Sequence, residues 1–400
     1  MAVVVQDLEL PGFEYLNPEL KGERFHAELQ RLRAHGWLAS MPLGFVVLDR
    51  EGGEFFLRSR AFTFPGLKIA EIFGIDEGPL AEEIRRNILH INGADHSRLR
   101  SLVNPEFTPR AVERWRPFMR ATIAALLENA QPGDDLVAAL AKPYPSRVIA
   151  ALMGAPEQDA DRLWEWSNLI QRQFGMTVAE ERPQIERAVT EFSAYTQALL
   201  DAKREHPGPD LVSRLVGTAD DVEILHLVLN VLVGGVDTTQ AQLAHALRLF
   251  ATHPEQWAAL AADPGLAPQA VEEVVRFEPI TPFTARTAME DVTFRDVLLP
   301  KDTIVLVCAH TGNRDGIDRP DTFDITRPAS KRVLTFGAGP HYCLGVNLAK
   351  AELQEALTHL APRMPELALS AEPVYGTIDG IYGLDELRAT WSQTSGPHPD

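Results

Sequence analysis

The chain has 400 residues, 45% hydrophobic and 24% charged, which is the composition of a globular protein with a large core. Its 38 Lys and Arg against 56 Asp and Glu give a formal net charge of −18, which argues against a nucleic acid as partner. Two cysteines make no disulfide framework, the N-terminus lacks a signal-peptide pattern and no run reaches about 18 apolar residues, so we expect a cytoplasmic protein without a membrane span.

The first ninety residues are predicted to hold a helix, a hairpin and a loop. The helix is amphipathic and lies near residues 25–35. Apolar runs at 45–49 and 54–57 flank a glycine-containing turn, a pattern typical of a β-hairpin. Residues 60–90 mix aromatic and aliphatic side chains with Pro and Gly and have no clean period, which predicts a mobile, partly apolar loop.

A helix start is predicted at 95–103, where His96 and Arg100 are four residues apart and share one face. A solvated polar face is the simple alternative there. The following hundred residues are helix-rich, with apolar positions three or four apart. The predicted helices cover 110–129, 146–153, 159–174 and 183–202.

The stretch 221–250 predicts a buried helix, because its first half is apolar on all sides. Gly234, Gly235, Asp237 and Thr238 interrupt it. Glycines weaken a helix and a buried charge needs partners, so such a violation favours a functional site over a simple packing kink. The glycines leave room for a ligand, and the Thr238 hydroxyl is placed to bond the Gly234 carbonyl.

Glu273 and Arg276 lie on one face of the next helix among valines, which indicates a buried ion pair. An extended Pro-rich segment at 279–285 follows it. Short strands are then predicted by apolar or alternating runs, and Cys308, in the last of them, is expected to be inert core. These strands cover 292–294, 297–299 and 303–309.

The stretch 336–345, FGAGPHYCLG, places Cys343 in a glycine-rich loop before a helix predicted at 348–361. Its glycines allow close approach to a flat ligand, and backbone N–H groups at a helix start favour a thiolate. A dinucleotide fingerprint fails because Tyr342 stands where a glycine is needed, and a zinc site lacks further ligands. A buried, inert cysteine is the remaining alternative.

This loop resembles the haem-binding loop of cytochrome P-450, a family whose haem iron carries a thiolate ligand. The other motifs follow in the family's order, since 95–103, 234–239 and the Glu273–Arg276 pair with Arg327 each have a counterpart. The resemblance implies a mainly α fold with a small β region and a long central helix over a buried haem. It implies one domain over 1–400. Its helix-rich parts would be about 90–280 and 345–362, and its β-rich parts about 43–58, 286–309 and the C-terminal region.

The resemblance also implies roles for individual residues. Haem b would be the cofactor, with its iron bound by Cys343. The other implied cofactor-binding residues are His96, Arg100, Arg286, His341, Gly345 and Phe336. Thr238 and Asp237 would be the catalytic pair that delivers protons during oxygen activation. The implied substrate-binding positions are Val233, Val236, Ile280, Phe283 and Tyr382, with the 62–89 loop and the 169–185 region.

The activity implied is monooxygenation of a lipophilic small molecule by O₂, with hydroxylation expected and electrons from a separate ferredoxin and its reductase. A basic surface on the cysteine side is expected to receive the ferredoxin; it comprises Arg98, Arg110, Arg332 and Lys350. A peroxide-driven haem peroxygenase and a non-catalytic haem sensor remain alternatives, although neither needs the Asp237–Thr238 pair. The loop at 380–383 lacks the Arg-Gly of many relatives, which puts its substrate contacts in doubt.

Overall fold

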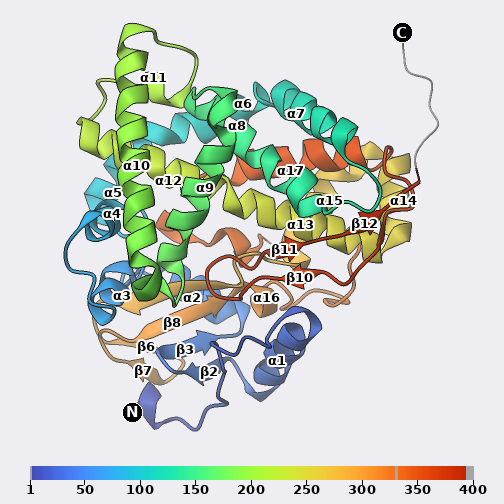
Figure 1. The fold of residues 1–400 in the computed structure, drawn as a ribbon. Helices are drawn as coiled ribbons and strands as arrows, with labels where there is room; N and C mark the ends of the chain where they lie inside the picture. The colour runs from blue at the N-terminus through green and yellow to red at the C-terminus, as the bar shows by residue number, and fades with distance from the viewer. Residues whose placement is uncertain (1, 329–331, 393–400) are drawn as a thin grey trace, which may run out of the picture.

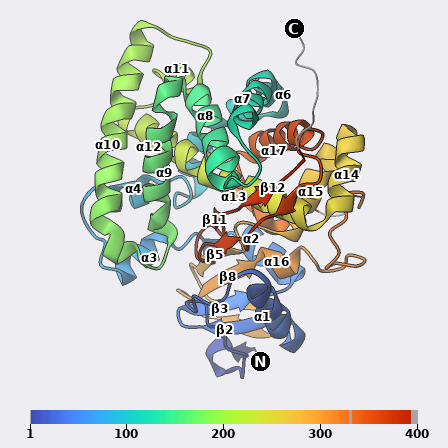
Figure 2. The same cartoon turned by 45° about the vertical axis from the view of Figure 1, so that its right-hand side comes forward.

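The computed structural model describes residues 2–328 and 332–392. Helices dominate it, and a smaller strand-rich region lies at the N-terminal end (Figures 1 and 2). The α-helices are α1 Gly22–His35, α2 Arg50–Arg58, α3 Gly66–Ile72, α4 Pro79–Arg86, α5 Gly93–Val103, α6 Pro109–Glu113, α7 Arg116–Asn129, α8 Pro143–Met153, α9 Ala160–Gln171, α10 Val178–Glu205, α11 Leu211–Leu215, α12 Asp221–Gly235, α13 Asp237–Thr252, α14 Pro254–Ala262, α15 Ala267–Phe277, α16 Ala309–Gly312 and α17 Val346–Leu360.

The strands form one five-stranded sheet and three small ones. The larger sheet has the order β2-β3-β8-β5-β4, with only β3 and β8 parallel. The strands are β1 Val3–Val4, β2 Leu38–Met41, β3 Gly44–Val47, β4 Phe62–Thr63, β5 Phe283–Ala288, β6 Val292–Phe294, β7 Val297–Leu299, β8 Ile304–Cys308, β9 Ala368–Leu369, β10 Val374–Tyr375, β11 Leu384–Glu386 and β12 Ala389–Thr390. The strands predicted at 292–294, 297–299 and 303–309 are confirmed.

The predicted central helix is present as α12 and α13, which continue one another through Val236. Asp220 starts α12 by accepting a hydrogen bond from the Glu223 N–H at 2.9 Å. The pair packs against α8, α9, α10 and α17, which explains why its apolar residues surround the axis. Residues 221–252 are the one described helix long and apolar enough to cross a membrane, yet 61% of its most apolar window is buried within the protein.

The hairpin predicted at 45–57 is wrong, because residues 50–58 form α2. The real hairpin joins β2 to β3. Asp49 begins α2 by accepting from the Gly52 N–H at 2.9 Å. A Cβ at Gly53 would lie 3.0 Å from Leu334 and Val307. That glycine therefore permits close packing of α2 and does not make a turn.

Two other predictions need correction. Residues 60–90 are not one loop, because they contain β4, α3 and α4; these elements are too short to show a period, and the buried side chains Leu80, Ala81 and Ile84 anchor α4. The helix predicted at 110–129 is two helices. Pro117 lies in the first turn of α7, where its missing N–H breaks no helical hydrogen bond.

The predicted buried ion pair is confirmed, and Arg327 joins it. The Arg276 Nε lies 2.7 Å from Glu273 Oε2, and the Arg327 Nε lies 3.3 Å from Glu273 Oε1. Both arginines also donate to backbone carbonyls of the 318–322 segment, so each buried charge has several partners. This cluster ties α15 to the meander that leads back to the cysteine loop.

Candidate functional site

A cavity of about 450 Å³ lies beside the α12–α13 junction. The cysteine loop, strands β5 and β8 and segments around 64–90 and 171–178 form its other walls. Of the predicted site residues, those in its wall are Arg100, Val233, Thr238, Ile280, Phe283, Arg286, Phe336, His341, Cys343 and Gly345. The predicted positions His96, Val236, Asp237 and Tyr382 lie outside that wall, for reasons given below.

Cys343 is held by its own loop. Its backbone N–H donates to the Phe336 carbonyl at 2.9 Å. Gly339 has a positive φ of +72°, and a Cβ there would lie 2.7 Å from the Leu57 carbonyl oxygen, so only glycine fits. Gly345 needs no such freedom, since its φ is −82° where it precedes α17. Burial raises the pKa of the Cys343 thiol, against the opposing effects of the Gly345 N–H and Arg100. Burial therefore affects the pKa of Cys343 more than the Gly345 N–H and Arg100 do.

Arg286 is a buried cation whose partner is not in the described protein. Its side chain is 3% exposed and donates to the Ala285 carbonyl at 2.8 Å, but it makes no ion pair with any described residue. Burial lowers its pKa to about 10, so it stays charged at neutral pH. A buried guanidinium is tolerated only with an anionic partner. A ligand carboxylate at this wall would supply that partner.

Arg100 and His341 flank the same end of the cavity. Arg100 donates to the Tyr342 carbonyl, and at 3.4 Å to the Pro340 carbonyl. His341 Nε2 lies 3.1 Å from Asn92 Oδ1, and its ring stacks at a tilt 4.3 Å from that of His96. Burial and the neighbouring positive groups lower the pKa of His341 to about 3, so it is neutral at pH 7. His96 lies behind it, out of the cavity wall.

The residue types at this end fit haem. Arg100, Arg286 and His341 in the cavity wall can meet two carboxylates at the edge of a flat ligand, and bidentate contact suits Arg. His96 supports the His341 ring from behind. Cys343 in the same wall can offer a sulfur ligand to iron. The unpartnered charge of Arg286 is the structural sign that an anionic group belongs there.

The α12–α13 junction is shaped as its glycines and threonine predict. The Thr238 hydroxyl donates to the Gly234 carbonyl at 2.7 Å, which removes that carbonyl from the helix ladder. A Cβ on Gly234 would meet nothing within 4 Å, so the helix surface is open to the cavity there. Gly235 serves packing instead, because a Cβ would come 2.4 Å from Ile149.

Asp237 points away from the cavity, toward α9. Its carboxylate accepts from the Ser167 hydroxyl, and at 3.3 Å from the Asn168 amide. Burial raises its pKa to about 6, although both hydrogen bonds and Arg172 act to lower it. Arg172 reaches the Asn168 oxygen at 3.3 Å and the surface residue Glu181 at 2.9 Å. A polar path therefore runs from Asp237 to the surface.

Sequence reasoning missed Ser167 and Asn168, the partners of Asp237. Their signal was weak: two adjacent polar residues on the otherwise apolar side of a helix. Two predicted substrate positions are also placed elsewhere. Val236 is fully buried in the junction. The Tyr382 hydroxyl accepts from the Gly22 N–H at 2.7 Å, so its side chain joins α1 to the C-terminal loop; Gly380 and Ile381 reach the cavity in its place.

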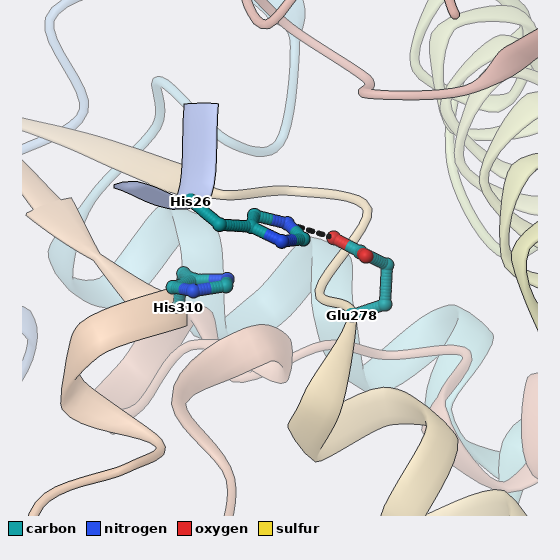
Figure 3. A group of neighbouring side chains, drawn as sticks. All are labelled: His26, Glu278 and His310. Carbon is teal, nitrogen blue, oxygen red and sulfur yellow. Dashed lines mark hydrogen bonds and ion pairs between the residues drawn. The ribbon is translucent and has the colours of Figure 1, made fainter. Parts of the chain in front are cut away.

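A second titratable cluster joins His26, Glu278 and His310 (Figure 3). His26 Nε2 lies 3.0 Å from Glu278 Oε1, and Arg248 lies 2.7 Å from Oε2. The two imidazoles stack at 4.4 Å with planes 26° apart. A metal ion must lie in the plane of each ring that binds it, which near-parallel stacked rings cannot both offer, and Arg248 already occupies the carboxylate. The cluster is a buried polar clamp between α1, α15 and α16.

Comparison with known proteins gives a consistent result. The cytochrome P450 family model matches residues 265–362. Luteothin monooxygenase of Streptomyces thioluteus is 34% identical over 391 residues, covering 95% of each chain. Mycinamicin IV hydroxylase/epoxidase of Micromonospora griseorubida is 36% identical over 326 residues, covering 78% of this chain and 77% of that one. The crystal structure of P450BioI with an acyl carrier protein bearing hexadec-9Z-enoic acid has a TM-score of 0.86 at 30% identity, covering 92% of this chain and 99% of that one.

Identity over almost the whole length, together with the shared fold, confirms the resemblance drawn from the cysteine loop. It also confirms the mainly α architecture with a small sheet region. The chain belongs to the cytochrome P450 family of oxygen-incorporating enzymes with cysteine-ligated haem, and is a monooxygenase of that family.

Proposed function

We propose that this monooxygenase hydroxylates a lipophilic small molecule, using haem b bound through Cys343. One observation carries the proposal: Cys343, Thr238 and the unpaired Arg286 converge on one cavity. Arg100 and Arg286 would hold the two propionates, with His341 and His96 beside them. Phe336 and Gly345 would pack on the haem face next to the sulfur. Bound haem supplies O₂ activation, in which one oxygen atom enters the substrate and the other leaves as water.

The proposed substrate is lipophilic because the cavity is walled mainly by apolar side chains, among them Val233, Ile280 and Phe283. Three large apolar side chains in its wall are also exposed to solvent. They are Leu16 at 56%, Leu43 at 36% and Leu89 at 36%. Exposed leucines at a cavity mouth favour uptake of an apolar molecule. The names of the two relatives, a monooxygenase and a hydroxylase/epoxidase, support the same reaction class.

Thr238 and Asp237 are the proposed proton-delivery pair. The Thr238 hydroxyl lies at the cavity wall, and Asp237 connects through Asn168 and Arg172 to the surface. A group with a pKa near the working pH transfers protons well in both directions, and that of Asp237 is about 6. We further propose that residues 1–400 form a single domain, that the protein is cytoplasmic, and that its electrons come from a ferredoxin and its reductase.

The cofactor assignment is tested by the carbon monoxide complex of the reduced protein. Wild type should show the strongly red-shifted Soret band of thiolate-ligated haem, and Cys343→His should lose it. Cys308→Ala is the matched control: that thiol is fully buried in β8, and its variant should keep the band. A Cys343→His protein that retains the band would contradict the proposal. Turnover with reductase and O₂, but not with peroxide alone, would separate this function from a peroxygenase.

A further inference from the structure

Gln173 is a buried side chain that no part of the described protein satisfies. It lies in the short turn Arg172–Phe174 between α9 and α10, is 5% exposed and belongs to the cavity wall. Neither its amide nitrogen nor its amide oxygen has a hydrogen-bond partner among the described residues. Buried amides are almost always hydrogen-bonded, so an unpaired one in a cavity wall points to a ligand.

Three other amide side chains of the same wall, Asn87, Asn230 and Gln242, have hydrogen-bond partners, whereas Gln173 has none. The Asn87 and Asn230 amides both donate to Glu83 Oε1, at 2.9 and 3.1 Å. The Gln242 amide donates to the Glu278 carbonyl at 3.0 Å. The hydrogen bonds of these three side chains join α4 to α12 and α13 to the end of α15.

Two further unpaired polar atoms lie in this wall, and neither is free to bind a substrate group. His90 Nε2 faces Gly66 so closely that a Cβ there would come within 2.1 Å, so the chain covers that nitrogen. Glu352 Oε1 belongs to a buried carboxyl group of α17 whose other oxygen accepts from the Thr239 hydroxyl at 3.5 Å, so this group already joins α17 to α13. Gln173 alone offers a free donor and a free acceptor.

The side chains around Gln173 indicate the chemistry of the rest of the ligand, beyond the group that would hydrogen-bond to the Gln173 amide. Phe174 follows it and meets Phe64 edge-on at 6.0 Å, while Phe64 stacks on His90 at 5.2 Å. Ile69 and Val178 are in the same wall. Aromatic faces with one polar contact suit a flat apolar body that carries a single hydrogen-bonding group.

We propose that Gln173 is the polar anchor of the substrate, and that the substrate class is lipophilic molecules carrying a secondary amide or an equivalent adjacent donor and acceptor. The substrate N–H would donate to the Gln173 oxygen, and its carbonyl would accept from the Gln173 nitrogen. This inference rests on the proposed function, because it names the substrate class of the same site.

The test uses two probes of similar shape. Benzanilide joins two phenyl rings through an amide, whereas trans-stilbene joins them through a carbon–carbon double bond. Binding to the haem-loaded protein is measured by calorimetry, which needs no turnover. Wild type should bind benzanilide about tenfold more tightly. Gln173→Leu should abolish that preference while keeping stilbene binding within about twofold. Gln171→Leu, which changes the half-exposed amide two residues earlier in the same wall, should keep the preference.

A preference that survives Gln173→Leu, or is absent from wild type, would overturn the inference. Thermal unfolding adds a second check. Because Gln173 makes no internal hydrogen bond, Gln173→Leu should leave the unfolding temperature unchanged or raised, and a clear drop would mean a structural partner. A protein with the thiolate–haem spectrum but without amide preference would refute this inference alone, whereas loss of that spectrum would refute the proposed function.

Discussion

Arg286 should destabilise the haem-free protein but stabilise the complex with haem. Its guanidinium is buried in β5 without a carboxylate from the described protein, and burial lowers its pKa to about 10. A charge in that position destabilises the protein unless a ligand neutralises it. The same residue should therefore weaken the haem-free fold and strengthen haem binding.

Replacing Arg286 should separate those two effects. Arg286→Met removes a charged hydrogen bond worth about 1.5–3 kcal/mol, so haem affinity should fall about 10- to 150-fold. The haem-free variant should unfold at higher urea than haem-free wild type, because a buried unpaired charge is gone. Haem transfer to excess apomyoglobin measures the first effect. Arg319→Met, at a 64% exposed side chain, should change neither. Equal haem retention in all three proteins would refute the role.

Substitutions of Thr238 and Asp237 should have different effects on the reaction with O₂. Thr238→Ala removes the hydroxyl at the cavity wall, so O₂ consumption should continue but yield peroxide in place of product. Asp237→Asn removes the group that links α9 to the junction, and should slow O₂ consumption itself, within the 10²- to 10⁴-fold range of a positioned acid. NAD(P)H use, peroxide and product are measured together with any accepted substrate. Wild-type coupling and rate in both variants would show that the pair is only a helix kink.

For single residues, the sequence predicted a role correctly where the residues that interact lie close together along the chain. Cys343 and Gly339 stand in one short loop, and the Thr238–Gly234 hydrogen bond joins residues four apart. Ser167 and Gln173 could not be found that way, since their importance arises from contacts with distant segments or from the lack of any. Tyr382 was misplaced for the same reason: its partner, the Gly22 N–H, is 360 residues away.

Among the elements, α1, α13 and α15 are joined by one buried carboxylate, and α16 contacts this cluster through a stacked imidazole. Glu278, at the end of α15, meets His26 from α1 and Arg248 from α13, while His310 from α16 stacks on His26 (Figure 3). Burial alone would raise the pKa of Glu278, but His26, Arg248 and His245 together hold it well below its usual value. The clamp therefore depends on the charged form.

Glu278→Gln should destabilise the protein by about 3–5 kcal/mol at pH 7, because it leaves the largely buried Arg248 guanidinium without its carboxylate. Since the folded pKa is depressed, this stability is fully present above the unfolded value of about 4.3 and is lost as the pH falls below it. The difference between wild type and variant should thus shrink below pH 4. Urea unfolding at several pH values measures it, with the exposed Glu290→Gln as control. A difference that does not depend on pH would contradict the charged clamp.

Elements were predicted well where a long apolar run marked a buried helix, or where short apolar runs alternated with turn residues. The α12–α13 rod and the strands at 292–294 and 297–299 appear where the pattern placed them. Residues 50–58 were misread because Gly52 and Gly53 signal a turn locally. In the structure Gly52 lies in the first turn of α2, where its N–H meets Asp49, and Gly53 lets the helix pack against Leu334 and Val307. Short helices such as α3 and α4 carry too few turns to establish a period.

For the whole molecule, the net charge is −18, so an acidic ferredoxin would be repelled overall and could dock only where the local surface is basic. At physiological ionic strength the Debye length is about 8 Å, so charges on remote faces are screened. Of the predicted basic surface, Arg98 is paired with Glu223 and Lys350 with Glu272, and Arg332 lies 3.6 Å over the Tyr342 ring. These contacts reduce the attraction expected from the sequence alone.

Arg110 and Arg332 are both exposed and have no ion pair among the described residues, but only Arg332 contacts an aromatic ring, so the Arg110 charge is the one left open to solvent. Arg110 lies on α6, which packs against α17, the helix that starts just after Cys343. Arg110→Glu should slow reduction by an acidic ferredoxin about tenfold at low salt, the lower end of electrostatic steering, and added salt should narrow the gap. Stopped-flow reduction under carbon monoxide measures the rate. Arg187→Glu, at an exposed position on α10, makes the same change in total charge and should slow reduction much less. Equal slowing in both variants would mean that total charge governs the encounter, and would remove the α6 face as the docking surface.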